Sequence, residues 1–493
     1  MDFSPLPEAA EGGASYNENS RILTMKMHLC GKWEDRDDKI EVLNPFDGSI
    51  IDTVPKASSD DVDRAVATAV QGAKIMAAMP AYERYQILHR AADLIEERQQ
   101  ELGRIVTLEE GKTIGEGVME AARALETMTL SAEEAKRLTG ETLPLDGSSN
   151  GAGKFGFTLR IPCGVVVAIT PFNFPLNLVC HKVGPALAAG NAVIIKPASD
   201  TPLSAIKVTE ILLEAGVPPE AIQCLTGSGA VVGDALSADS RVRKISFTGS
   251  RDVGEQICKT GGLKKVTMEL GSNAPLIVMP DADLEKVALA TASSGFNNAG
   301  QVCISAQRVL VSGEVYEDFI EVLKPKIEAL STGDPLEPGV KMGPMIRESD
   351  AARVHEWIHE AVGGGARLVA GGERVGTMHQ PTIVADVHPD MRLSREEVFG
   401  PAVGLTRFDS IDDAIAMAND SNYGLSAGIF TQNIDWALKF AREVHTGNVH
   451  VNWGTQWRAD IMPYGGVKDS GMGKEGPKYA VEEMTELKLV VFH

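Results

Sequence analysis

Residues 164–170, Gly-Val-Val-Val-Ala-Ile-Thr, decide the fold class of this chain. An unbroken apolar run of this kind is typical of a parallel strand that is covered by helices on both faces. Downstream, residues 176–189 predict a helix and residues 191–196, Asn-Ala-Val-Ile-Ile-Lys, predict a second buried strand. Thr201 and Pro202 have the residue types that open the next helix, as N-cap and first helical residue. Strand–helix alternation of this kind predicts a doubly wound α/β sheet, which is a natural platform for a nucleotide.

The rest of the chain divides into segments of different pattern. Residues 1–20 are polar and predict a loose tail, residues 21–55 carry short β-like runs, and residues 59–138 show the apolar spacing of helices. Residues 143–160 break that spacing and predict a projecting hairpin around a glycine-rich turn. A second α/β series follows over about 275–470. Two large units are expected, because single cores stop growing at roughly 250–300 residues.

The composition excludes several classes of protein. Forty-three per cent of the 493 residues are apolar, as in globular proteins, and the net charge of −21 argues against a nucleic-acid binder. The longest apolar runs, such as 165–169, are far shorter than the roughly 20 residues of a membrane span. The N-terminus lacks the features of a secretory signal. None of the six cysteines forms a C-x-x-C pair, so we expect no metal site and a reduced, cytoplasmic protein.

Six short segments carry residues with chemical potential. In chain order they are Thr170–Pro175, Lys196-Pro197, Phe247–Ser250, Met268–Ser272, Asn298–Cys303 and Glu396–Pro401. Together, in this order and at about this spacing, they resemble the aldehyde dehydrogenase superfamily over nearly the whole chain. The resemblance implies a Rossmann-like cofactor domain (1–142 and 161–272), an α/β catalytic domain (273–472) and a β oligomerisation arm (143–160 and 473–493). It also implies that the arm adds a strand to a neighbour's sheet, giving a homodimer or homotetramer.

Three of these residues are expected to perform the chemistry. A thiolate is a strong nucleophile, and the resemblance makes Cys303 the group that attacks the aldehyde carbon. It makes the side-chain amide of Asn173, with the backbone N–H of Cys303, the donor to the oxyanion. Glu269 resembles the base that activates water to hydrolyse the resulting thioester after hydride has left for the nicotinamide. The family usually has Thr at position 302, and this chain has Val302.

Two rival functions stay open from the sequence. In a coenzyme-A-acylating dehydrogenase the acyl group would pass to a thiol, but that branch typically lacks a base at the position of Glu269. In a non-catalytic member the fold would serve binding alone, which intact Cys303, Glu269 and Asn173 argue against.

The cofactor is expected to be NAD or NADP. Residues 227–233 are close to a dinucleotide fingerprint but have one residue too many, and Ser250 opens a helix that can face the pyrophosphate. Position 199 is Ser where NAD-selective members commonly carry Glu, so NADP is expected to be tolerated or preferred; the alternative, a neutral Ser199 and retained NAD, stays open. The predicted cofactor residues are Thr170, Phe172, Lys196, Ser199, Gly229, Phe247, Gly249, Ser250, Leu270, Glu397 and Phe399.

Three residues are candidates for binding the aldehyde. Arg458 lies in a loop that lines the tunnel in several family members and could pair with an anionic tail; a structural arginine is the alternative. Arg123, on a predicted helix, could reach the same tunnel or be an ordinary ion-paired residue. His181 and Asn297 stand where succinate-semialdehyde members carry arginines, which puts that substrate in doubt. A small aldehyde bearing phosphonate, sulfonate, phosphate or carboxylate is the expected partner.

Overall fold

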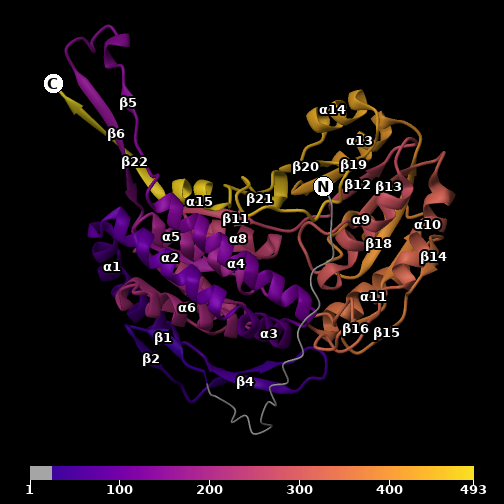
Figure 1. Ribbon diagram of the computed structural model, residues 1–493, viewed down its shortest axis with the longest axis horizontal. Helices are drawn as coiled ribbons and strands as arrows, with labels where there is room; N and C mark the ends of the chain where they lie inside the picture. Colours follow the sequence, from indigo (N-terminus) through magenta and orange to yellow (C-terminus); the bar gives the residue numbers. More distant parts are fainter. Residues whose placement is uncertain (1–24) are drawn as a thin grey trace.

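A computed structural model describes residues 25–493, so the tail predicted for 1–20 lies outside the described residues. Figure 1 shows two α/β lobes side by side, with an arm that projects from the first lobe. Each lobe is built on one large sheet. The short N-terminal runs form β1 (Met27–Leu29), β2 (Lys32–Glu34), β3 (Lys39–Leu43) and β4 (Ile50–Pro55).

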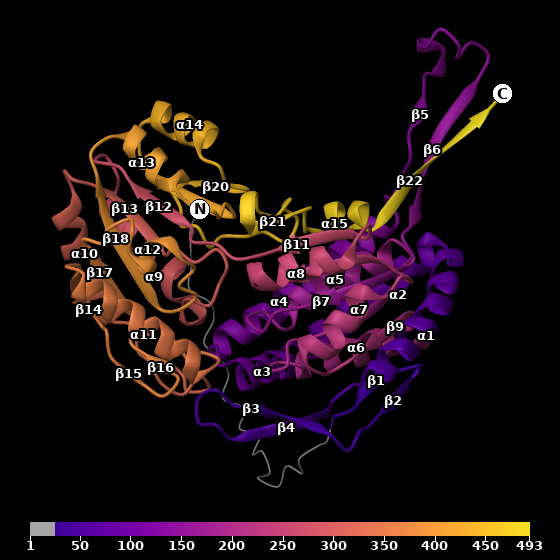
Figure 2. The ribbon, with the colours of Figure 1, turned by 180° about the vertical axis from the view of Figure 1, so that it is seen from behind.

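The first lobe is built on a doubly wound sheet, as predicted. This sheet has eight strands. Its order is β2-β1-β9-β8-β7-β10-β11-β21, and the five strands from β9 to β11 are parallel to one another. Every residue of β7 (Val165–Ile169) and β8 (Ala192–Lys196) is buried, because helices cover both faces (Figure 2). The other strands of this group are β9 (Ile222–Cys224), β10 (Val242–Thr248) and β11 (Lys265–Glu269).

The helices of the first lobe follow the predicted periodicity. Residues 59–135 form α1 (Ser59–Ala78), α2 (Ala81–Glu97), α3 (Gln99–Glu110) and α4 (Ile114–Ala135). The later ones are α5 (Asn177–Ala188), α6 (Leu203–Ala215), α7 (Asp234–Ala238) and α8 (Arg251–Gly261).

The start of α6 corrects one detail. Pro202, not Thr201, is its N-cap, and the buried carboxylate of Glu109 accepts hydrogen bonds from the first two N–H groups, at 2.7 Å from Leu203 and 2.9 Å from Ser204. A distant residue thus satisfies the donors that a local cap would satisfy.

The second lobe is a seven-stranded sheet in the order β14-β17-β18-β13-β12-β19-β20. Its strands are β12 (Pro275–Val278), β13 (Arg308–Ser312), β14 (Arg367–Ala370), β17 (Thr382–Ala385), β18 (Ala402–Phe408), β19 (Ser426–Phe430) and β20 (Asn448–Val451). Its longer helices are α9 (Leu284–Phe296), α10 (Tyr316–Glu328), α11 (Glu348–Gly363), α13 (Ile411–Asn419) and α14 (Ile434–Glu443). Strands β15 (Arg374–Val375) and β16 (Met378–His379) form a separate hairpin.

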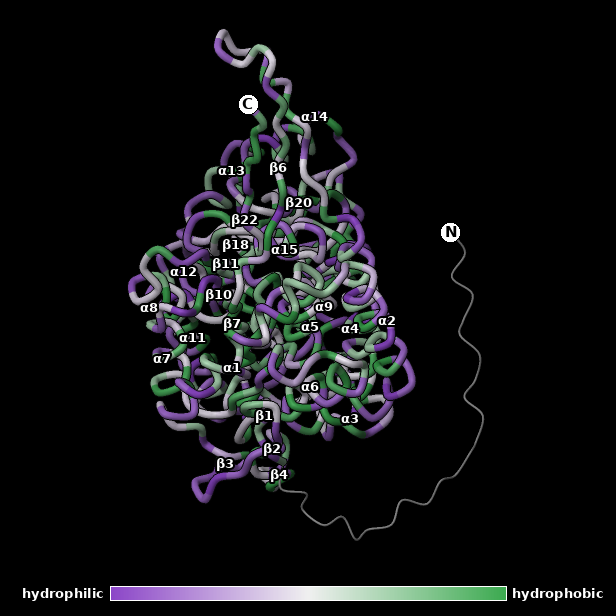
Figure 3. The backbone as a smooth tube through the Cα atoms, turned by 90° about the vertical axis from the view of Figure 1, so that its left-hand side faces the viewer, coloured by the Kyte–Doolittle hydropathy of each residue, from purple (hydrophilic) through white to green (hydrophobic). Residues whose placement is uncertain are grey.

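The arm is a three-stranded antiparallel sheet in the order β22-β6-β5. Figure 3 shows it projecting beyond the rest of the molecule. It contains the predicted hairpin, β5 (Thr142–Leu143) with β6 (Phe155–Pro162), and the C-terminal strand β22 (Thr485–Phe492). The topology corrects the predicted bounds at the C-terminal side. Strand β21 (Gly471–Met472) pairs with β11 in the first sheet, and α15 (Pro477–Glu483) packs against α4 and α5, so only β22 of segment 473–493 belongs to the arm.

Candidate active site

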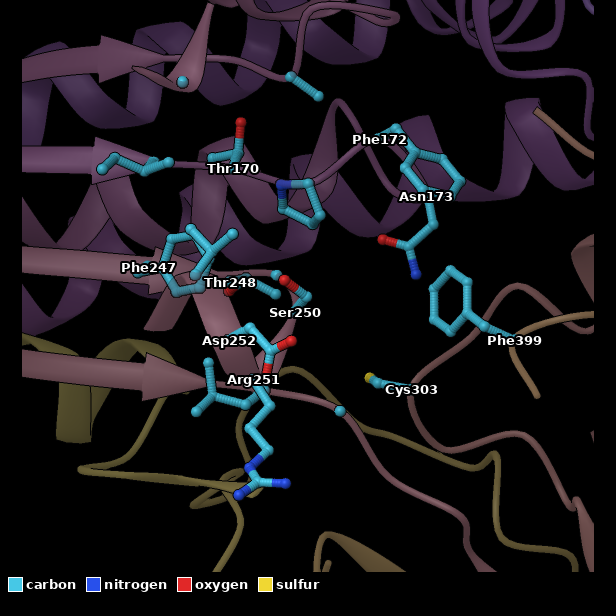
Figure 4. Close-up of a pocket in the computed structure, with 18 of the residues that line it drawn as sticks. Thr170, Phe172, Asn173, Phe247, Thr248, Ser250, Arg251, Asp252, Cys303 and Phe399 are labelled. Carbon is cyan, nitrogen blue, oxygen red and sulfur yellow. The ribbon is translucent and has the colours of Figure 1, made fainter. Parts of the chain in front are cut away.

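A cleft of about 960 Å³ opens where β7, β10 and β11 end, and loops of the second lobe form its other wall. Figure 4 shows Thr170 and Thr248 beside the ends of neighbouring strands and Cys303 on a loop across the cavity. Ligands of doubly wound sheets bind at the carboxyl ends of the strands, which is the position of this cleft. All eleven residues predicted to bind the cofactor line it.

The cleft has features that fit a dinucleotide. The hydroxyl of Thr170 is buried without a hydrogen-bond partner, so it is available to a ligand. Ser250 precedes the first turn of α8, whose free N–H groups suit a pyrophosphate. At the other end, the rings of Phe172 and Phe399 meet edge to face, with centroids 5.8 Å apart, and so form an apolar wall.

Two charged groups are buried at opposite ends of this cleft. Burial lowers the pKa of Lys196 to about 8, and the charge of Asp200 partly opposes that shift. The ammonium group of Lys196 donates a hydrogen bond to the carbonyl of Pro197 at 2.8 Å. Burial raises the pKa of Glu397 to about 7, although its carboxylate accepts a 2.8 Å bond from the N–H of Ser272. A Cβ atom at Gly271 would lie 2.5 Å from Glu397 Oε2, so only glycine permits this approach.

Ser199 lies on the cleft wall beside the loop that follows β9. Its hydroxyl donates to the carbonyl of Gly227 at 3.1 Å. Arg347, which also lines the cleft, forms an ion pair with Asp200, the residue next to Ser199. A serine hydroxyl and a cation near this end are compatible with an added phosphate.

The loop that carries Cys303 begins with a strained turn. Asn298, Ala299 and Gly300 all have positive φ angles, of 53°, 51° and 70°, so the preceding helix α9 cannot continue into this segment. Asn298 is fixed there, because its N–H donates to Glu116 and its side-chain amide donates to Glu110, both at 2.8 Å. Non-glycine residues adopt such φ angles at a cost that surrounding contacts must offset.

Cys303 lies at the wall shared by the cleft and a second cavity. Its Sγ atom is 3.2 Å from the hydroxyl of Tyr464. Burial raises the pKa of the Cys303 thiol to about 12, while the hydrogen bond from Tyr464 acts in the opposite direction. Burial disfavours the thiolate, which is the nucleophilic form of cysteine, so a hydrogen-bond donor is needed to stabilise it.

Asn173 is held rigidly beside the cysteine loop. Its backbone carbonyl accepts hydrogen bonds from Lys112 Nζ at 2.7 Å and from Asn298 Nδ2 at 3.2 Å. Its own Nδ2 donates to the carbonyl of Gln301 at 2.8 Å, which leaves its second hydrogen for another acceptor. The backbone N–H of Cys303 also has no acceptor within residues 25–493. Two donors therefore remain available near the sulfur.

Glu269 ends β11 between the two cavities. Both carboxyl oxygens are buried and, within the described residues, neither has a hydrogen-bond partner. Burial and then the charge of Glu475 raise its pKa well above the usual range. Burial also disfavours ionisation of Glu475, but Lys182, 2.5 Å away, and Arg458 lower its pKa to about 2. The negative charge of the pair therefore resides on Glu475.

The second cavity, of about 240 Å³, lies on the far side of Cys303 from the cleft. Arg458 lines it, and its side chain is 8 % exposed. Its Nη2 atom contacts Glu475 at 3.4 Å and His181 Nε2 at 3.1 Å. Its Nε atom lies 3.9 Å from an oxygen of Asp460 and, like Nη1, has no hydrogen-bond acceptor within residues 25–493. Arg123 also lines the cavity, and its guanidinium donates two hydrogen bonds to the carboxylate of Asp460, at 2.7 and 3.1 Å.

His181 is corrected as a substrate ligand, because it does not line this cavity. It is 1 % exposed and lies behind the wall, with Nε2 2.8 Å from Asp460. Burial, and then the charge of Arg458, lower its pKa to about 4. His181 and Asp460 therefore hold the arginines in place from behind.

Sequence reasoning missed four residues of the site: Tyr464, Lys182, Glu475 and Asp460. Tyr464 and Asp460 lie in the same loop as Arg458, so that loop carries the signal for them. Lys182 and Glu475 are 293 residues apart, and no local pattern marks them as a pair.

Residues 25–493 contain no group of three His, Cys, Asp or Glu side chains arranged to hold a metal ion. None of their helices combines the length and apolarity that crossing a membrane requires.

A Rossmann-like cleft joined to a half-buried cysteine, a buried carboxyl group and a buried amide is the arrangement of a nucleotide-dependent enzyme. The model of the aldehyde dehydrogenase family matches residues 33–490. The chain belongs to this family and is an NAD(P)-dependent oxidoreductase that acts on an aldehyde.

Individual relatives are similar over nearly their full length. The chain is 48 % identical over 467 residues to the 3-sulfolactaldehyde dehydrogenase of Priestia megaterium, which covers 95 % of this chain and 98 % of that protein. It is 39 % identical over 477 residues to the NADP+ succinate-semialdehyde dehydrogenase of Escherichia coli, with 95 % and 98 % coverage.

Solved structures show the same fold. Aldehyde dehydrogenase 21 from Physcomitrella patens, in complex with the product succinate, has a TM-score of 0.93 at 37 % identity and covers 96 % of this chain and 99 % of that one. The NADP complex of glyceraldehyde-3-phosphate dehydrogenase from Methanocaldococcus jannaschii has a TM-score of 0.90 at 39 % identity, with 93 % and 100 % coverage.

Proposed function

We propose that this enzyme oxidises a small aldehyde with an anionic tail to the corresponding carboxylate. The observation that carries the proposal is the guanidinium of Arg458, which lines the second cavity. Within residues 25–493 its Nε and Nη1 atoms have no hydrogen-bond acceptor, although carboxylate oxygens of Asp460 and Glu475 lie at ion-pair distances of 3.9 and 3.4 Å. A buried donor without an acceptor is costly, so an oxygen of the substrate is the natural partner.

The distance from Arg458 to the nucleophile favours a short substrate. Its guanidinium carbon lies 3.9 Å from the centre of the Tyr464 ring, and the hydroxyl of that ring touches Cys303. An anion on Arg458 is therefore about one tyrosine ring from the sulfur. This spacing, with a cavity of about 240 Å³, suits a chain of few carbons.

The names of the relatives are compatible with this substrate class. The 3-sulfolactaldehyde dehydrogenase carries a sulfonate substrate in its name, and other relatives are an aspartate-semialdehyde dehydrogenase at 44 % identity and the succinate-semialdehyde dehydrogenase. Their substrates share a short chain, an aldehyde and an anion. The absence of arginine at His181 and Asn297 makes a sulfonate or phosphate as good a candidate as a carboxylate.

The first half of the proposed mechanism uses Cys303 and Asn173. The thiolate of Cys303 attacks the aldehyde carbon, and the carbonyl electrons move to oxygen to give a thiohemiacetal. The free hydrogen of Asn173 Nδ2 and the N–H of Cys303 stabilise that oxyanion. The residues of the cleft would hold NAD(P)+, which would supply the acceptor for a hydride. When the oxyanion collapses, the C–H bond breaks, its electron pair leaves with the hydrogen as hydride, and a thioester on Cys303 remains.

The second half uses Glu269. The ionised form of its buried carboxyl group takes a proton from water, and because the pKa is raised, that form becomes more populated as pH rises. The hydroxide adds to the thioester carbon, the carbon–sulfur bond breaks, and the carboxylate product leaves. This base also distinguishes the reaction from acyl transfer to coenzyme A.

An aldehyde panel tests the substrate class. Purified enzyme would be assayed at 340 nm with sulfonated, phosphorylated and carboxylated three- and four-carbon aldehydes and with uncharged aldehydes of equal length, with and without coenzyme A. We expect Arg458→Met to lower kcat/KM for the anionic set by about a hundredfold relative to the uncharged set, because a charge-assisted hydrogen bond is lost. Arg104→Met, an exposed arginine on α3, is the matched control. Equal losses in both sets would overturn the anion site, and coenzyme-A-dependent product would overturn hydrolysis.

The cofactor preference and the assembly are part of the proposal. Ser199 places no carboxylate where a 2′-phosphate would lie, which supports use of NADP. The arm leaves apolar side chains in solvent, with Leu487 61 %, Leu489 54 % and Phe492 58 % exposed, and β20 ends the second sheet as an edge strand. We propose that the arm pairs with another copy of the chain, giving a dimer or tetramer.

A further inference from the structure

The hydroxyl of Tyr464 is the polar side-chain group that contacts the nucleophilic sulfur. Its Oη lies 3.2 Å from Cys303 Sγ, within hydrogen-bond distance for sulfur. The side chain is 3 % exposed and lines the second cavity, so the ring cannot turn freely into solvent. No other side chain within residues 25–493 makes a hydrogen bond to this sulfur.

A cation lies over the face of the same ring. The guanidinium carbon of Arg458 is 3.9 Å from the ring centroid, within the range of a cation–π contact. Two carboxylates hold this arginine in place: its Nη2 atom lies 3.4 Å from an oxygen of Glu475, and its Nε atom lies 3.9 Å from an oxygen of Asp460. A positive charge on the ring face withdraws electron density from the phenol, which makes its O–H a stronger donor.

We propose that Tyr464 is a catalytic residue that donates a hydrogen bond to the thiolate of Cys303, and that Arg458 strengthens this donor from behind the ring. The proposal rests on the role of Cys303 as nucleophile but not on the identity of the aldehyde. Donation to sulfur matters because charge-assisted hydrogen bonds are the strong ones, and this site is buried.

The hydroxyl acts twice in the cycle and keeps its proton throughout. When Cys303 ionises, its proton leaves to solvent through the cleft and Tyr464 bonds the sulfur anion. On attack, a sulfur electron pair forms the S–C bond, the sulfur loses its charge and the hydrogen bond weakens. In hydrolysis, water oxygen joins the carbonyl carbon, Glu269 takes the proton, and the C–S bond breaks with its electron pair on sulfur. Tyr464 then stabilises the departing thiolate.

The electrostatic surroundings explain why such a donor is needed. Burial raises the pKa of the Cys303 thiol, and the carboxyl groups of Glu269 and Glu397 raise it further. The hydrogen bond from Tyr464 and the charge of Arg458 lower it. The tyrosine thus opposes three features of its own site that disfavour the thiolate.

The test is Tyr464→Phe, which removes the hydroxyl and keeps the ring. Site-resolved mass spectrometry would follow alkylation of Cys303 by iodoacetamide from pH 6 to 10, with no aldehyde present. We expect alkylation to slow about tenfold at each pH, which corresponds to a rise of about one unit in the pKa of the thiol. Hydrolysis of the acyl-enzyme formed from p-nitrophenyl acetate should also slow about tenfold. Tyr82→Phe, which alters a 62 % exposed tyrosine on α2, should change neither rate.

A second substitution keeps the proposal open to refutation if Tyr464→Phe folds poorly. Replacement of Tyr464 by 3-fluorotyrosine preserves the shape and makes the phenol more acidic, so alkylation at each pH should become faster. An unchanged alkylation rate in both variants would overturn the role of the hydroxyl. Cys303→Ser tests the nucleophile separately: if Cys303 is the nucleophile, this variant should lose both alkylation and turnover. Tyr464→Phe should remain active but slower, so failure of the tyrosine proposal can be distinguished from failure of the nucleophile assignment.

Discussion

Asn173 and Gln301 are joined by a 2.8 Å hydrogen bond from the side-chain amide of the first to the backbone carbonyl of the second. This bond fixes the proposed oxyanion donor to the loop of the proposed nucleophile, because Gln301 lies two residues before Cys303. The donor and the sulfur therefore keep a constant relation when the cleft binds its ligands.

Asn173→Ala should lower kcat by about 10²–10³-fold, since an oxyanion donor of this kind is worth that factor. The change also removes the bond to Gln301, so the melting temperature should be measured beside the steady-state rate. Asn150→Ala, in the exposed hairpin of the arm, is the control. A variant that folds normally and keeps most of its kcat would contradict the role of Asn173.

The sequence predicted the parts of this fold that depend on short-range patterns. The unbroken apolar runs of β7 and β8 signalled strands covered on both faces, and both are fully buried. Contacts between distant segments could not be predicted in this way. Tyr464 meets Cys303 across 161 positions, and His181 lies behind the cavity although its neighbour Lys182 reaches Glu475. The depth of a side chain depends on tertiary packing, which no local pattern records.

Glu269→Gln should separate the two halves of the reaction. The variant cannot activate water, so we expect one equivalent of reduced cofactor per active site, followed by turnover slowed about 10²–10⁴-fold. In the parent enzyme, hydrolysis should slow as pH falls through the raised pKa of Glu269, because the base is then protonated. Rapid-mixing absorbance at 340 nm measures both effects. Glu97→Gln, exposed on α2, is the control, and the absence of a burst in Glu269→Gln would be evidence against this base.

Glu397 should make cofactor binding depend on pH. The ionised carboxylate of Glu397 can accept hydrogen bonds from ribose hydroxyls. Because its pKa is about 7, the group becomes protonated as pH falls below that value. The Kd for NADP should therefore rise as pH falls from 8 to 6, by up to about tenfold per unit below pH 7. Titration calorimetry measures this. Glu397→Gln should bind more weakly at pH 8 and show a flat profile, whereas the exposed Glu373→Gln should retain the slope. A flat profile in the parent enzyme would refute the prediction.

Ser199→Glu should shift the enzyme toward NAD. A carboxylate beside Gly227 would repel a 2′-phosphate and could accept a bond from a 2′-hydroxyl, so kcat/KM for NADP should fall at least about a hundredfold while that for NAD changes little. Steady-state kinetics with both cofactors decide the matter. Ser148→Glu in the arm controls for added charge. If the parent enzyme already prefers NAD by a hundredfold or more, the proposed tolerance of NADP is wrong.

The apolar face of β22 should determine the assembly. Leu487 and Leu489 lie two residues apart on one strand, so they share a face, and both are more than half exposed in the single chain. Changing both to Asp would place charges where another copy is expected to pack. Sedimentation velocity should then show monomers in place of a dimer or tetramer, with cofactor binding retained because the cleft lies in a different part of the lobe. Val375→Asp, at an 83 % exposed position of β15, should leave the assembly unchanged. An unaltered oligomer in the double variant would show that another surface holds the copies together.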